Sequence, residues 1–136
     1  MPEVTVNLTA VIIAAVANII IGSVWYSPAL FGKQWMDLVG FKATDMKKKE
    51  MGKSYLAAFG VALLTAYVLA NILGFAGAKT AVGGAQVGFW SWLGFSFTTM
   101  SGAVIWLKKP LNLLAIDAGQ LLVSYIVMGM ILATWV

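Results

Sequence analysis

The sequence predicts an all-α membrane protein, a four-helix transmembrane bundle with a short interfacial helix between the first two spans. Charged residues are absent from residues 4–32, 54–78 and 80–107, and residues 110–136 contain only Asp117. Each gap exceeds the run of about 20 apolar residues that a helix needs to cross a bilayer. The composition agrees, because 61% hydrophobic and 10% charged residues leave too few polar groups to cover a soluble globule.

The first apolar segment predicts a helix over residues 8–26 that is retained in the protein. A cleavable signal carries positive residues before its apolar run, whereas the first lysine here, Lys33, follows the run. The remaining charge gaps predict helices over residues 55–75, 86–107 and 111–135. These helices occupy the chain as one integral membrane domain, residues 1–136.

The loop after the first span predicts a short helix that lies in the membrane interface. Pro28 ends the first helix, because proline cannot continue it. Beyond it, Phe31, Trp35, Leu38 and Val39 recur at helical spacing opposite polar residues. We interpret this segment as an anchor.

Lysine positions predict the orientation in the cell inner (cytoplasmic) membrane. The loops after the first and third spans hold eight of the nine lysines, and Lys79 alone lies on the other side. Because cytoplasmic loops retain positive charge, we expect these loops in the cytoplasm and both termini outside. Aromatic residues would then line the inner interface (Trp25, Tyr26, Tyr55, Trp106) and the outer interface (Trp90, Trp92, Trp135).

A run of three lysines, Lys47, Lys48 and Lys49, precedes the second span. These residues are candidates for binding anionic lipid head groups, and a topology signal explains them equally well. Their position beside membrane segments favours lipid over nucleic acid as the partner.

Small residues predict how the helices pack, because in lipid close backbone approach has to supply the dispersion energy. We interpret the stripes of small residues as structural. A stripe that faces a second copy would instead make a homo-oligomer. The stripes are Ala10, Ala14, Asn18 and Gly22 on the first helix, Ser54, Ala58, Ala62, Ala66, Ala70 and Gly74 on the second, Gly94, Thr98 and Gly102 on the third, and the pairs Ala115 with Gly119 and Gly129 with Ala133 on the fourth.

Polar residues inside the spans form the candidate functional site. Asp117 lies seven residues past Pro110, about 10 Å along a helix. A carboxylate at that depth costs at least about 2.5 kcal/mol, so it should face the bundle interior and find hydrogen-bond partners or stay protonated. Counting residues from the cytoplasmic ends of the other helices places Asn18, Thr98 and Ser101 at about the same depth as Asp117. Gln120 and Ser124 lie on the same face of the last helix as Asp117.

Two interpretations of Asp117 stay open. An intramembrane ionisable group is a functional hypothesis by default. The same group can be a packing residue held by Asn18 and Gln120, through contacts that average about 0.6 kcal/mol.

The segment Trp25-Tyr26-Ser27-Pro28-Ala29-Leu30-Phe31-Gly32-Lys33-Gln34-Trp35 resembles the signature of small prokaryotic membrane proteins grouped as domain of unknown function family 1761. The stretch from Ala115 to Ser124, followed by Met128-Gly129, is similar to that family's last helix. The resemblance spans nearly the whole chain. It implies a four-helix membrane fold and brings no established activity, substrate or catalytic residue. The interfacial motif comprises Trp25, Tyr26, Ser27, Pro28, Phe31, Gly32, Lys33 and Trp35.

Two function classes follow. The first is a small oligomeric conduit or carrier for protons, cations or a small solute, with Asp117, Gln120 and Asn18 along a polar path. The second is a non-catalytic scaffold or accessory subunit that contacts lipid or a partner protein. We expect no enzyme, metal or cofactor, because the chain has no cysteine or histidine and no second buried carboxylate for an acid–base pair.

Overall fold

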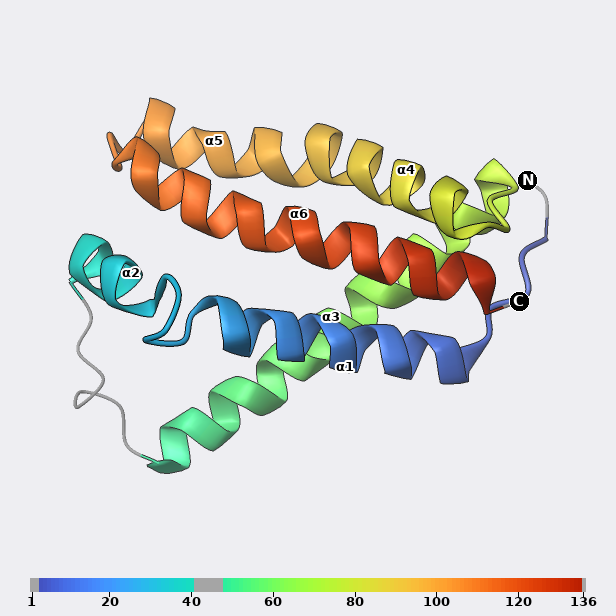
Figure 1. Ribbon diagram of the computed structural model, residues 1–136, viewed down its shortest axis with the longest axis horizontal. Helices are drawn as coiled ribbons and strands as arrows, with labels where there is room; N and C mark the ends of the chain where they lie inside the picture. Colours follow the sequence, from blue (N-terminus) through green and yellow to red (C-terminus); the bar gives the residue numbers. More distant parts are fainter. Residues whose placement is uncertain (1–2, 41–47, 136) are drawn as a thin grey trace.

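The computed structural model describes residues 3–40 and 48–135, and the regular structure in these stretches is helical throughout (Figure 1). The all-α prediction is therefore confirmed. Three helices are long and apolar enough to cross a membrane: α1 (Leu8–Trp25), α3 (Lys48–Ala76) and α6 (Leu111–Thr134). The first and last described residues lie at one end of the molecule, and α2 (Gly32–Val39) lies at the other (Figure 1).

α1 and α6 each begin at the predicted residue, whereas α3 begins earlier than the predicted residue 55. Charge content marks where a bilayer begins, and lysine is a good helix former, so the helix extends past the apolar stretch. Lys47 lies outside the described residues, as do the side chains of Lys48 and Lys49. α2 occupies the predicted place, and its position in the interface stays a prediction.

Residues 81–105 form one unbroken helical run beside α6 (Figure 1). It consists of α4 (Ala81–Ser91), the π-helix η2 (Trp92–Phe97) and α5 (Thr98–Ile105). The run begins before the predicted residue 86, because the Thr80 side chain caps it by accepting from the Gly83 N–H over 3.0 Å. The predicted boundary at residue 86 was therefore wrong, and the glycine pair Gly83 and Gly84 lies inside the helix.

α4 packs on α6 with almost no space between the backbones. A Cβ at Gly84 would collide with the Gly129 carbonyl, and a Cβ at Gly88 with the Tyr125 carbonyl. Every-fourth glycines therefore make this contact, as small residues do between membrane helices. The predicted stripe on this helix lies elsewhere, since a Cβ added at Gly94 would meet nothing within 4 Å.

The apolar core lies between α1, α3 and α6, in the half of the molecule nearer the termini. Its members are Ala10, Val11, Ala14, Ala66, Leu69, Leu73, Met128, Leu132 and Ala133. Only part of the predicted stripe on α3 is internal: Ala62 and Ala66 are buried, whereas all residues from 50 to 58 are exposed. α3 crosses the other helices obliquely, so its first half leaves the bundle (Figure 1).

Candidate functional site

The segment between α1 and α2 folds into a tight turn. The Ser27 hydroxyl donates to the Val24 carbonyl over 2.7 Å, and the Gly32 N–H donates to the Ser27 carbonyl over 3.0 Å. A Cβ at Gly32 would collide with the carbonyl oxygens of Tyr26 and Ser27. The turn therefore requires glycine at this position.

The aromatic residues of the interfacial motif pack in two pairs at this turn, one tilted and one edge-to-face. The rings of Trp25 and Phe31 have centroids 4.8 Å apart, and those of Tyr26 and Trp35 are 5.6 Å apart. Such ring pairs add stabilisation beyond the area they bury. Of the remaining motif members, Lys33 is exposed and Pro28 is exposed as well.

Three aromatic side chains from outside α6 donate hydrogen bonds to three consecutive residues of α6. We call Trp25, Tyr26 and Trp92 the aromatic clamp. The bonds run from Trp25 Nε1 to the Ile116 carbonyl (2.9 Å), from Tyr26 Oη to Asp117 Oδ1 (2.6 Å) and from Trp92 Nε1 to the Ala118 carbonyl (2.9 Å). The clamp fixes the rotation and height of α6 against α1 and η2.

Asp117 thus has a hydrogen-bond donor, Tyr26, that the sequence did not predict for it. Tyr26 lies just past the end of α1, and its burial, followed by the hydrogen bond to Asp117 and that group's charge, raises the pKa of the hydroxyl. The phenol therefore remains a donor at neutral pH. On its other side Asp117 borders a pocket of about 160 Å³ that Lys109 also lines.

Three side chains form what we call the amide cluster: Gln120 and Ser124, about one and two turns past Asp117 on α6, and Asn18 on α1. Gln120 Nε2 donates to Ser124 Oγ over 2.8 Å and, more weakly, to Asn18 Oδ1 over 3.5 Å. Ser124 is fully buried and Gln120 is 8% exposed. The predicted meeting of Asn18 with Gln120 is present in the structure.

A groove between α1 and α3, with a volume of about 470 Å³, reaches the amide cluster. It exists because the first half of α3 leaves the bundle. We call it the polar groove, and its main lining residues are Asn18, Gly22, Tyr26, Tyr55, Ala58, Val61 and Gln120.

Asn18 and Gln120, which line the polar groove and which we call its floor, each have one amide group that is free among the residues the structure describes. In the described part of the chain, Asn18 Nδ2 and Gln120 Oε1 have no hydrogen-bond partner, and neither atom is fully buried. The described lining residues carry no charge. The floor can therefore bind an uncharged group that both accepts and donates hydrogen bonds.

The two predicted site residues of the third helix lie apart from the amide cluster. The Thr98 hydroxyl donates to the Gly94 carbonyl over 2.7 Å, and the Ser101 hydroxyl donates to the Phe97 carbonyl over 2.8 Å. Helical hydroxyls often satisfy themselves in this way. Thr98 is also exposed, so the structure does not bring it to Asp117.

Trp92 differs most from its expected place. Its position in the sequence predicted the outer interface, but it is only 8% exposed and bonds to α6. It belongs to η2, a short π-helix of the kind that is frequent at functional sites. No pattern in the sequence marks that widened turn.

No group of three or more His, Cys, Asp or Glu side chains in residues 3–40 and 48–135 is arranged to hold a metal ion.

Comparison with curated proteins and with solved structures found no match. A family model does match, over residues 9–133, and its matched range contains both the aromatic clamp and the amide cluster. The chain therefore belongs to the family described as protein of unknown function (DUF1761).

Proposed function

We propose that this chain crosses the membrane four times and carries a small uncharged polar solute, which binds in the polar groove. Three long apolar helices support the membrane location. Residues 81–105 supply the fourth crossing, because a helix of that length extends about 37 Å and the hydrocarbon is about 30 Å thick.

Charge supports the orientation. α2 and the turn between α5 and α6 lie at one end of the molecule, with Lys33, Lys108 and Lys109 (Figure 1). The connection that contains Lys79 lies at the other end with both termini. The positive-inside rule then directs the lysine-bearing end to the cytoplasm.

The observation that carries the proposal is the free hydrogen-bonding capacity at the floor of the polar groove. Gln120 lies ten residues after Pro110, about 15 Å along the helix and thus near the bilayer midplane. Free amide atoms at such a depth are costly unless a ligand or water satisfies them. A bound solute that accepts from Asn18 and donates to Gln120 satisfies both.

The same geometry argues against an open channel within one chain. Beyond the amide cluster, buried apolar residues such as Ala14, Ala66 and Met128 block the space between the helices. A solute in the groove can reach the other side only if a helix moves. α3 is the candidate, because its exposed first half forms one wall of the groove.

Protons and cations fit the site less well than a neutral solute. Asp117, the one carboxylate within the predicted spans over residues 8–26, 55–75, 86–107 and 111–135, is bonded to Tyr26 and borders a separate pocket. Lys109 lines that pocket, and its positive charge repels an entering cation. A homo-oligomer, the alternative interpretation of the small-residue stripes, stays a prediction and is not required for this mechanism.

Flux into proteoliposomes tests the proposal with glycerol and urea as uncharged probes. Reswelling after an osmotic step, followed by light scattering, should be faster with protein than without for at least one probe. Ala58→Phe adds a ring inside the groove from an exposed position on α3 and should abolish the increase. Leu56→Phe, on the same helix at a residue 73% exposed and outside the groove, should leave it intact.

A folded wild-type protein that moves neither probe would contradict the carrier proposal. The tightly packed apolar half of the bundle would then favour the second candidate function, a non-catalytic scaffold or accessory subunit. A third outcome is that the wild-type protein admits protons but neither solute, and that Asp117→Asn abolishes the proton entry. This result would instead favour a proton conduit that depends on Asp117.

A further inference from the structure

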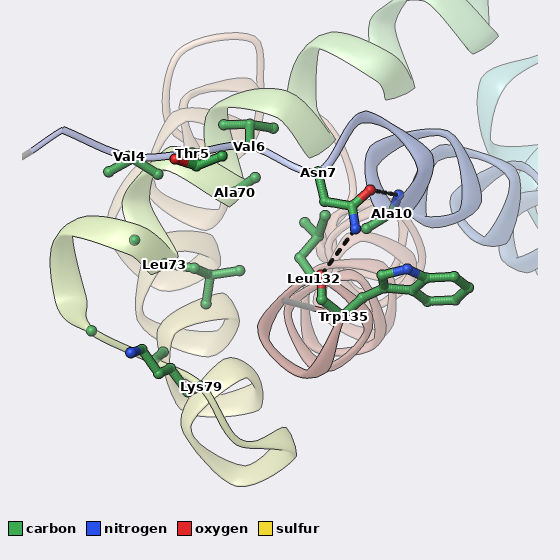
Figure 2. A pocket seen from close by; sticks show the side chains of 13 residues that line it. Val4, Thr5, Val6, Asn7, Ala10, Ala70, Leu73, Lys79, Leu132 and Trp135 are labelled. Carbon is green, nitrogen blue, oxygen red and sulfur yellow. Dashed lines mark hydrogen bonds between the residues drawn. The ribbon is translucent and has the colours of Figure 1, made fainter.

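A further pocket lies at the opposite end of the molecule from the lysine-bearing loops. It has a volume of about 420 Å³ and is enclosed by the extended segment that precedes α1, the end of α3 and the end of α6 (Figure 2). We call it the outer pocket. Its apolar wall consists of Val4, Val6, Ala10, Ala70, Leu73 and Leu132.

The extended segment is fixed in place at both of its ends. Val4 packs so closely on α3 that a Cβ at Gly74 would collide with its side chain. Asn7 caps α1 by accepting from the Ala10 N–H over 3.2 Å, and its amide also donates to the Trp135 carbonyl over 3.5 Å (Figure 2). The pocket is therefore built by three segments held to one another.

Lys79 supplies a positive charge at this pocket. It lies on the connection beyond α3 and lines the pocket with its apolar neighbours (Figure 2). None of the described lining residues is acidic. Glu3 lies next to Val4 but does not line the pocket, and within the described residues no carboxylate pairs with Lys79.

We propose that the outer pocket binds a single-chain anionic amphiphile, with its acyl chain between Val6, Leu73 and Leu132 and its head group at Lys79. The pocket volume is near the small end of ligand sites, which suits one chain rather than the two of a phospholipid. A chain that enters from water gains about 0.8 kcal/mol for each methylene it buries, whereas a chain that enters from the bilayer gains almost nothing, so discrimination between ligands rests on the head group. Lys79 selects the anionic head group.

Photo-crosslinking in nanodiscs of zwitterionic phosphatidylcholine tests this proposal. The probe is dodecanoate that carries a diazirine near the end of its chain, and labelled residues are mapped by mass spectrometry. Label should concentrate on peptides that contain Val6, Leu73 and Leu132. Unlabelled dodecanoate and dodecyl phosphate should compete better than dodecanol. Comparing dodecanoate with dodecyl phosphate then distinguishes a carboxylate from a phosphate head group.

Lys79→Gln should weaken dodecanoate competition about two- to fivefold, the effect of one exposed ion pair, and should leave dodecanol unchanged. Lys53→Gln, an exposed lysine at the other end of α3, is the matched control. Label that rises without saturation and spreads over exposed residues such as Leu56 and Leu64 would show simple partition into lipid. That result, or equal competition by dodecanol, would overturn the proposal, and neither bears on the polar groove.

Discussion

Removing the Tyr26 hydroxyl tests whether the clamp holds Asp117 in place. Tyr26→Phe deletes the donor of the 2.6 Å bond to Asp117 Oδ1 and keeps the ring that contacts Trp35. A hydrogen bond to a charged group contributes about 1.5–3 kcal/mol in proteins generally, whereas intramembrane bonds average about 0.6 kcal/mol. Because the 160 Å³ pocket beside Asp117 has room for water that can replace part of the lost bond, we expect a loss of about 1 kcal/mol in the free energy of unfolding.

A double-mutant cycle isolates this bond from other effects of the substitutions. Tyr26→Phe, Asp117→Leu and the double variant are unfolded reversibly by dodecyl sulfate in mixed micelles, with circular dichroism as the signal. In the Asp117→Leu background, Tyr26→Phe should cost almost nothing more, which gives a coupling near 1 kcal/mol. Additive losses, or a Tyr26→Phe variant as stable as the wild type, would refute the assignment of this hydroxyl to Asp117.

Two further substitutions test the packing of the helical run over residues 81–105. Gly84→Ala should destabilise the protein by about 1–3 kcal/mol, because the added methyl group overpacks against Gly129. The control Gly94→Ala, where nothing lies within 4 Å of the added Cβ, should be neutral or slightly stabilising. Equal melting temperatures of the two variants in detergent would contradict the contact between Gly84 and Gly129. Trp92→Phe keeps an aromatic ring but removes the donor to the Ala118 carbonyl, so it should lower the free energy of unfolding by about 1 kcal/mol. Trp90→Phe, at a residue 66% exposed, is the control. A loss for Trp92→Phe no larger than that for Trp90→Phe would contradict the buried hydrogen bond.

Sequence alone was sufficient to predict the elements whose ends are marked by composition. α6 begins directly after Pro110, and α1 begins at the predicted Leu8, within the charge gap of residues 4–32. The start of residues 81–105 was missed because a glycine pair can either break a helix or allow close packing. Only the partner helix decides, and Gly84 lies against Gly129.

The depth of the candidate site residues along their helices was predictable, but the direction in which each side chain points around its helix axis was not. A count along each helix placed Asn18 and Gln120 at matching heights, and they do meet. The same count placed Thr98 there too, but it follows η2, whose wider turn changes the direction of every later side chain. The bond between Tyr26 and Asp117 joins residues 91 apart in sequence, and no local pattern indicates such a pairing.

We propose that residues 81–105 cross the bilayer, with the lysine-bearing turns on the cytoplasmic side. Because the chain has no cysteine, Lys79→Cys and Lys109→Cys each introduce a single thiol, one at each end of this run. A membrane-impermeant maleimide applied to intact cells should label the cysteine at position 79 and leave the one at position 109 unlabelled until the membrane is opened. Equal labelling of both from outside would show that the run does not cross, and the depth of the polar groove would then have no basis.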